Sequence, residues 1–127
     1  MQKEIERHIK ENGVMNFMVG CHGNFDRYAA SVLRVIKRKH PQIMLTLLLP
    51  FHPVEMPVEK PEWFDVAYHP TEMYNIPLAK RLEALDVLAV KMSEYMIAYA
   101  QEDRTRTSIV VKRARKHGVN VTLLPNM

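Results

Sequence analysis

One segment, residues 14–27, restricts the fold of this chain more than any other. Its first seven residues, 14–20, are almost all apolar and predict a buried strand. Gly20 and Gly23 then predict a tight turn, and a helix is expected from about Phe25. Open α/β sheets bind ligands beyond the carboxyl ends of their strands. This strand–turn–helix junction is therefore the first candidate for a functional site.

The alternation of strands and helices continues along the chain. Helical spacing of apolar residues predicts helices over residues 2–11, 25–39, 77–91 and 105–117. Apolar runs predict the remaining strands at residues 43–49, 64–68, 94–100 and 119–124. Together these elements predict an α/β fold, a three-layer Rossmann-like domain. Its sheet is expected to be five-stranded and mostly parallel, with the strand order 3-2-1-4-5.

Length and cysteine content limit the class of protein. A chain of 127 residues predicts one domain spanning residues 1–127. Cys21 is the only cysteine, which excludes an internal disulfide and suits a reducing compartment. No apolar run approaches the roughly 20 residues of a membrane span, and residues 1–7 lack the apolar core of a signal peptide. We therefore expect a cytoplasmic protein with no membrane segment.

The basic charge permits anionic partners. The net charge is +4, and much of the excess lies in residues 34–40 and 104–117. Such a balance suits polyanions or phosphorylated small molecules. The alternative is that these are solvated helix faces, because basic residues in a last turn also complement the helix dipole.

The predicted strand order brings two distant segments together. Strand 1 lies beside strand 4, so residues 20–27 and 99–108 are expected to meet at one crevice. Glycine turns and helix starts present N–H groups, and arginines with hydroxyls complete a cradle for an anion. The alternative is that the glycines serve the turn and the hydroxyls cap the helix. The predicted ligand-binding residues are Gly20, Cys21, His22, Gly23, Asn24, Asp26, Arg27, Pro50, Phe51, Arg104, Thr105, Arg106, Thr107 and Ser108.

Three stretches of the chain carry a resemblance to a known family. They are residues 20–26, residues 47–51 before a proline-rich loop, and residues 95–100 before a polar loop and helix. In these stretches the chain resembles the SLOG superfamily of Rossmann-like domains, which includes DprA and the LOG phosphoribohydrolases. The branch most similar is an uncharacterised bacterial one related to YpsA-like proteins. The resemblance implies a pocket for a nucleotide or a nucleotide-derived small molecule over the strand ends.

Two carboxylates are candidates for catalysis. Asp26 and Glu72 are the predicted catalytic pair if the chain cleaves an N-glycosidic bond. The alternatives are that Asp26 favours the helix dipole and that Glu72 is a surface residue.

Cysteine and histidine residues near the strand ends suggest two further chemistries. Cys21 and His22 are adjacent on an extended segment and point opposite ways, so they are poorly placed to act as nucleophile and base. His52 and His69 also fall near strand ends, but the spacing matches no recognised zinc site. We predict no metal site and no cofactor.

Three functions follow, in order of preference. The first is a sensor or binding module that holds a nucleotide-like small molecule between strands 1 and 4. The second is an enzyme that cleaves or transfers an N-glycosidic bond, and the third is a DNA-binding protein. DNA ranks last because the chain carries no recognised nucleic-acid motif. The apolar helix around residues 78–90 is a candidate homodimer surface.

Overall fold

A computed structural model describes residues 1–21, 23–52, 54–55, 58–99 and 105–125. The chain divides into two compact units, Met1–Asn75 and Ile76–Met127, and each is described by itself. Among the described residues, strands alternate with helices and all strand pairs are parallel. The predicted α/β class is therefore confirmed. A single domain over residues 1–127 stays a prediction.

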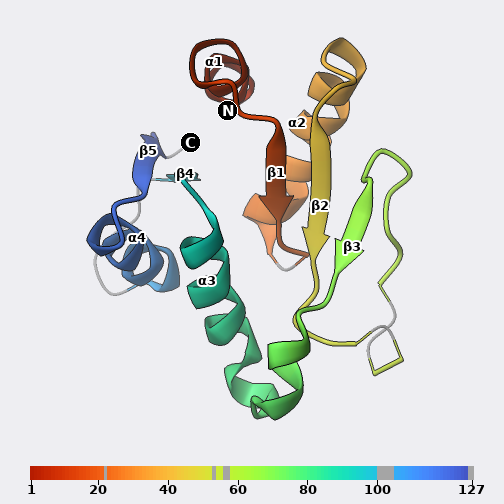
Figure 1. Ribbon diagram of the computed structural model, residues 1–127, viewed down its shortest axis with the longest axis vertical. Helices are drawn as coiled ribbons and strands as arrows, with labels where there is room; N and C mark the ends of the chain where they lie inside the picture. The colour runs from red at the N-terminus through yellow and green to blue at the C-terminus, as the bar shows by residue number, and fades with distance from the viewer. Residues whose placement is uncertain (22, 53, 56–57, 100–104, 126–127) are drawn as a thin grey trace. The chain divides into compact units, whose positions relative to one another are not determined.

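The first unit is built around a three-stranded parallel sheet (Figure 1). Its strands are β1 (Asn16–Val19), β2 (Met44–Leu48) and β3 (Val66–Tyr68). Its helices are α1 (Gln2–Asn12), α2 (Asn24–Lys39) and the 3₁₀ helix η1 (Thr71–Asn75). The strand order β1-β2-β3 places β2 in the centre and β3 at the edge, as the sequence predicted. Helix α2 connects β1 with β2, so these three elements form a βαβ unit.

Local sequence explains how the elements of the first unit begin and end. Helix α1 ends because Gly13 adopts φ 65°, the left-handed conformation that glycine accommodates best. At the amino end of β3, Asp65 accepts a hydrogen bond from the backbone N–H of Leu45 at 2.8 Å and an ion pair from Lys37 at 3.1 Å. Lys37 also donates to the carbonyl of Ile43. Three elements are thus tied together at one end of the sheet.

The core of the first unit lies mainly between α2 and the sheet. Apolar residues recur at helical spacing on α2, and burying each such side chain contributes about 1.5–3 kcal/mol. Buried apolar residues of this unit include Ile5, Ala29, Leu33, Ile36, Ile43, Leu45, Leu47 and Phe64.

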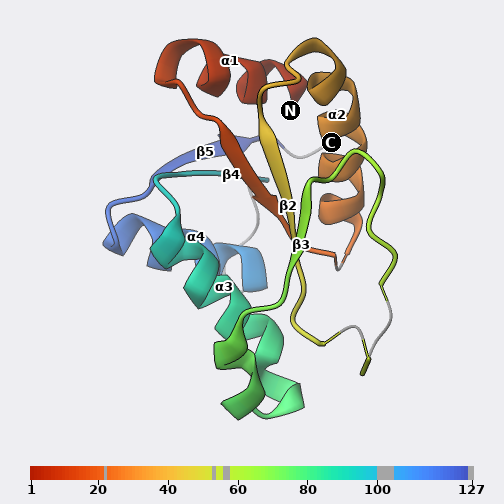
Figure 2. The same ribbon diagram turned by 45° about the vertical axis from the view of Figure 1, so that its right-hand side comes forward.

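The second unit contains a two-stranded parallel sheet (Figure 2). Its strands are β4 (Tyr95–Tyr99) and β5 (Asn120–Leu124). Its helices are η2 (Leu78–Lys80), α3 (Arg81–Met92) and α4 (Arg106–Lys116), and α3 and α4 lie side by side. Val90, Ala114 and Val119 form its buried centre, so both helices contribute to one core. Gly118, just beyond the end of α4, adopts φ 79°, a conformation that glycine accommodates best.

The prediction of one five-stranded sheet is wrong. All five strands form, and the pairings of strand 1 with 2, 2 with 3 and 4 with 5 follow the predicted order. Among the described residues, however, the hydrogen-bonded ladders form a three-stranded and a two-stranded sheet. The predicted pairing of strand 1 with strand 4 was taken from the general topology of doubly wound sheets. Apolar patterns predict that a strand exists, but they carry no signal for which distant strand lies beside it.

Two details concern the predicted helices of the second unit. The helix expected from Pro77 begins as a 3₁₀ turn, and Leu78 is 59% exposed because regular α-helix starts only at Arg81. The apolar residues of the predicted helix 105–117 include Ile109 and Val111, of which Ile109 is 50% exposed and Val111 is buried. Residues 109–111 are all β-branched and apolar, so periodicity alone leaves the helix rotation ambiguous. Val111 shares its face with Ala114, which fixes the rotation observed.

Within the described part of the chain, no helix has the length and apolar character needed to cross a membrane.

Candidate functional site

The turn after β1 brings Asp26 against Gly20. Gly23 has φ 95°, which explains the second glycine, and it forms the N-cap of α2. At Gly20 the constraint is the space that Asp26 occupies, and not the backbone angle. A Cβ atom at Gly20 would lie 2.8 Å from Oδ2 of Asp26, closer than carbon and oxygen can approach. The Asp26 carboxylate, in the first turn of α2, therefore lies directly over the backbone of the preceding strand end.

Cys21 belongs to the same cluster and is held as a thiol. Burial is the main cause that raises its pKa above the ordinary value, and the charge of Asp26 raises it further. A nucleophilic cysteine needs the opposite environment, one that lowers its pKa. Covalent catalysis by Cys21 is therefore disfavoured by its surroundings.

The other predicted residues of the first unit differ in exposure. Asn24 and Arg27 are exposed, Phe51 is half-buried and Pro50 is buried just beyond β2. His22 lies outside the described residues, and so does Arg104 of the second unit. Glu72, the second predicted catalytic residue, is exposed on η1 and accepts a hydrogen bond from the Thr71 hydroxyl at 3.2 Å. No described contact joins it to Asp26, so their catalytic pairing stays a prediction.

The start of α4 supplies the second predicted segment. Thr105 is the N-cap, and its hydroxyl accepts the backbone N–H of Ser108 at 3.1 Å. The Ser108 hydroxyl donates back to the carbonyl of Thr105 at 2.9 Å. Arg106 donates through Nε to Asp86 of α3 at 2.8 Å, which ties α4 to α3. The capping role that the sequence offered as an alternative is thus present for two of these residues.

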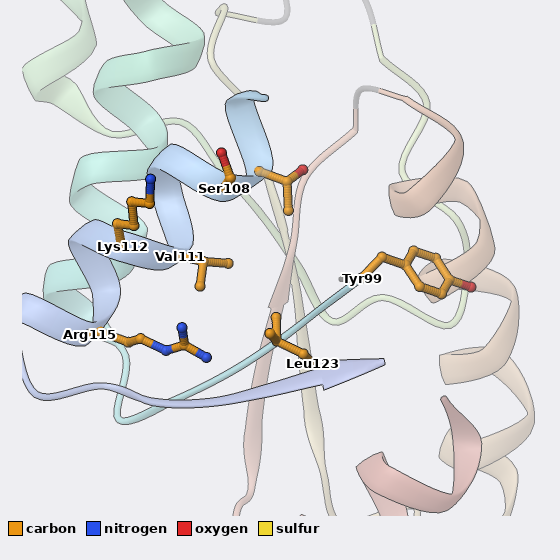
Figure 3. A pocket seen from close by; sticks show the side chains of 7 residues that line it. Tyr99, Ser108, Val111, Lys112, Arg115 and Leu123 are labelled. Atoms are coloured by element: carbon orange, nitrogen blue, oxygen red, sulfur yellow. The ribbon is translucent and has the colours of Figure 1, made fainter. Parts of the chain in front are cut away.

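A pocket lies beside this helix start, at the carboxyl end of β4 (Figure 3). Its cavity volume is about 120 Å³, and it opens to solvent. Figure 3 shows the side chain of Arg115 extending toward Val111 and Leu123, and the ring of Tyr99 pointing away from them. The lining residues are Tyr99, Thr107, Ser108, Val111, Lys112, Arg115 and Leu123. The pocket therefore combines two cations and three hydroxyls with an apolar floor.

The sequence predicted only Thr107 and Ser108 of this lining as ligand-binding residues. It missed Lys112 and Arg115, which it treated as part of a basic cluster. A signal was present, because positions 108, 112 and 115 are three or four residues apart and share one helix face. The predicted crevice between strands 1 and 4 would join the two units and stays a prediction.

The described part of the chain contains no cluster of three or more potential metal ligands. Within residues 1–21, 23–52, 54–55, 58–99 and 105–125, no three side chains of histidine, cysteine, aspartate or glutamate are placed to hold one ion. A site with three protein ligands, as in catalytic zinc centres, is not formed by these residues.

Comparison of the chain with protein-family profiles, with curated proteins and with solved structures found no match.

Proposed function

We infer that this chain binds a phosphorylated, nucleotide-derived small molecule and acts as a sensor or regulatory module. The observation that carries the proposal is the pocket of the second unit, which is lined by Lys112 and Arg115 and by the hydroxyl residues Thr107 and Ser108. Arginine and lysine bind phosphate oxygens through charge-assisted hydrogen bonds, which are about twice as strong as neutral ones. A phosphate is the ligand group that this lining suits best.

Other lining residues suit the rest of such a ligand. Tyr99 supplies an aromatic ring, and Val111 and Leu123 supply apolar surface. Aromatic rings stack on planar bases, and apolar walls exclude water around them. Tyr99 and the two cations line the same pocket, so the lining includes both charged and aromatic residues.

We propose that the fold carrying this site is a Rossmann-like, three-layer fold of the SLOG type. Its support is the βαβ unit with parallel strands and the position of the pocket at a strand end beside a helix start. The junction of Gly20, Cys21 and Asp26 belongs to the first unit and is a second candidate contact for the same class of ligand.

Thermal unfolding against a panel of nucleoside monophosphates, nucleosides and sugar phosphates tests the proposal. A ligand at about 100 times its Kd should stabilise the protein by about 2.7 kcal/mol.

Arg115→Ala should weaken binding roughly tenfold or more, because a charge-assisted hydrogen bond contributes about 1.5–3 kcal/mol. Lys116→Ala is the matched control, a cation on the same helix outside the pocket lining. An absence of any shift across the panel, or equal losses in both variants, would contradict the proposal.

A further inference from the structure

Three aromatic side chains gather beyond the carboxyl ends of β2 and β3, within the first unit. The ring centroids of His52 and His69 are 5.8 Å apart, and their planes are perpendicular, at 88°. Tyr74 of η1 lies 5.4 Å from His69 and 6.3 Å from His52. His69 follows the last residue of β3, and His52 lies beyond β2. Because β2 and β3 are parallel neighbours, both histidines lie at the same end of the sheet, beyond the carboxyl ends of these strands.

The hydrogen bond of His69 determines which of its nitrogens can accept. Nδ1 lies 2.9 Å from the carbonyl oxygen of Leu49. A carbonyl only accepts, so Nδ1 carries the proton and donates it. In the neutral ring, Nε2 then holds the lone pair. This is the arrangement of a metal-ligating histidine, whose other nitrogen typically donates to a backbone carbonyl or carboxylate.

Among the described residues, no donor reaches the lone pair on Nε2 of His69. The atom is buried and forms no hydrogen bond with the described residues. A buried polar atom left without a partner costs about 1–3 kcal/mol. Such groups are uncommon in folded proteins, and an ion or a water molecule is one of the usual reasons for them.

We propose that His52 and His69 form a binding site for a divalent transition-metal ion of the Zn²⁺ class. Imidazole nitrogens favour zinc, copper and nickel over magnesium and calcium. Two imidazoles on one zinc ion, at Zn–N distances of about 2.0–2.1 Å, have ring centroids about 5–6 Å apart. The observed separation of 5.8 Å falls in that range. Water completes the coordination, since the described residues supply no third ligand from cysteine or acidic side chains.

His52 changes one contact when the ion binds. Its Nδ1 accepts the backbone N–H of Val54 at 3.1 Å. Ligation through Nε2 places the proton on Nδ1, and ligation through Nδ1 uses its lone pair. Either way the Val54 amide loses its acceptor. Val54 is 84% exposed, so water replaces that bond at small cost.

The test is a titration of the full chain with Zn²⁺ alone. Calorimetry measures the binding, and NMR monitors the histidine rings and the Val54 amide during the titration. The informative variants are His69→Asn and His52→Asn. An asparagine side-chain amide occupies the position of Nδ1, so it can keep the bond to Leu49 or Val54 while removing Nε2. His117→Gln is the matched control for a histidine outside the cluster, and Cys21→Ser excludes the only thiol.

The expected result is a Zn²⁺ affinity at least tenfold lower in His69→Asn and in His52→Asn, and unchanged in both controls. Zn²⁺ should also shift the ring nitrogens of both histidines and the Val54 amide in the unsubstituted chain. Equal Zn²⁺ affinity in the unsubstituted chain and His69→Asn would overturn the proposal, and so would absence of Zn²⁺ binding. Circular dichroism confirms that each variant is folded, and the ring-nitrogen shifts decide the question without any variant.

Discussion

Asp26 affects two neighbours in different ways. Its carboxylate lies where a side chain at Gly20 would have to be, so it restricts residue 20 to glycine or forces a rearrangement. Its charge also opposes ionisation of the Cys21 thiol. A glycine in a turn can therefore reflect the space that a neighbouring carboxylate occupies, with no unusual backbone angle at that glycine.

Asp26→Asn should make Cys21 more reactive. Burial is the larger cause of the raised pKa and remains, but the opposing charge is removed. We expect alkylation by iodoacetamide near neutral pH to accelerate roughly two- to tenfold, since one pKa unit is a tenfold change in thiolate fraction. Mass spectrometry follows the reaction cleanly because the chain has a single cysteine. Glu11→Gln, a carboxylate that does not contribute to this pKa, should leave the rate unchanged; a rate unaffected by Asp26→Asn would remove Asp26 as a cause.

At the scale of elements, Asp65 connects β3 to β2 and α2. The backbone N–H of Leu45 is the main cause that holds the pKa of this carboxyl below its ordinary value, and Lys37 lowers it further. The ionised form is therefore stabilised in the folded state. Its contribution is present in full above the ordinary aspartate pKa and is lost as the pH falls through the lowered folded-state pKa.

Asp65→Asn should accordingly lower stability at neutral pH and have less effect in acid. The amide oxygen can still accept the Leu45 N–H, but the charge opposite Lys37 is lost. We expect a loss of about 1 kcal/mol at pH 7, typical of a hydrogen-bonded ion pair at a partly exposed site. The difference from the unsubstituted chain should shrink as the pH falls below about 4. Urea unfolding at several pH values measures it, and a difference that grows in acid would contradict the assignment.

Elements of this chain were easier to predict than their assembly. The apolar runs located β1, β2, β4 and β5 correctly to within a few residues. The short segment at 64–68 was correctly predicted to contain an edge strand. The pairing of the strands into sheets was not predictable in the same way. The apolar pattern of a strand indicates that the strand is buried, but it does not identify the neighbouring strand. The contact of His52 with His69 was also missed. The predicted strand order includes the pairing of β2 with β3, but it does not determine how the loops beyond the two strands fold and bring these rings together.

At the scale of the whole molecule, ion pairing reduces the effect of the basic charge. Several cations lie within 4.0 Å of a carboxylate in the chain itself. They are Arg7, Lys10, Lys37, Arg106 and Arg113. Each such pair places a negative charge beside the positive one and weakens the field that a polyanion would feel. The net charge of +4 already includes these carboxylates, so the pairing leaves that charge unchanged but occupies cations that could otherwise contact phosphates.

We accordingly expect weak DNA binding that disappears at physiological salt. Affinity for DNA rises with the number of cations free to replace counterions, and each phosphate contact steepens the salt dependence. Fluorescence anisotropy of labelled single- and double-stranded DNA should show weak association at low salt and none at about 150 mM with micromolar protein. A phosphate-bearing small molecule held in the pocket of Lys112 and Arg115 should lose less affinity over the same range, because it makes fewer phosphate contacts than a DNA strand. Tight DNA binding that persists at 150 mM salt would show that unpaired cations form a continuous surface, and would favour the DNA-binding hypothesis over the small-molecule one.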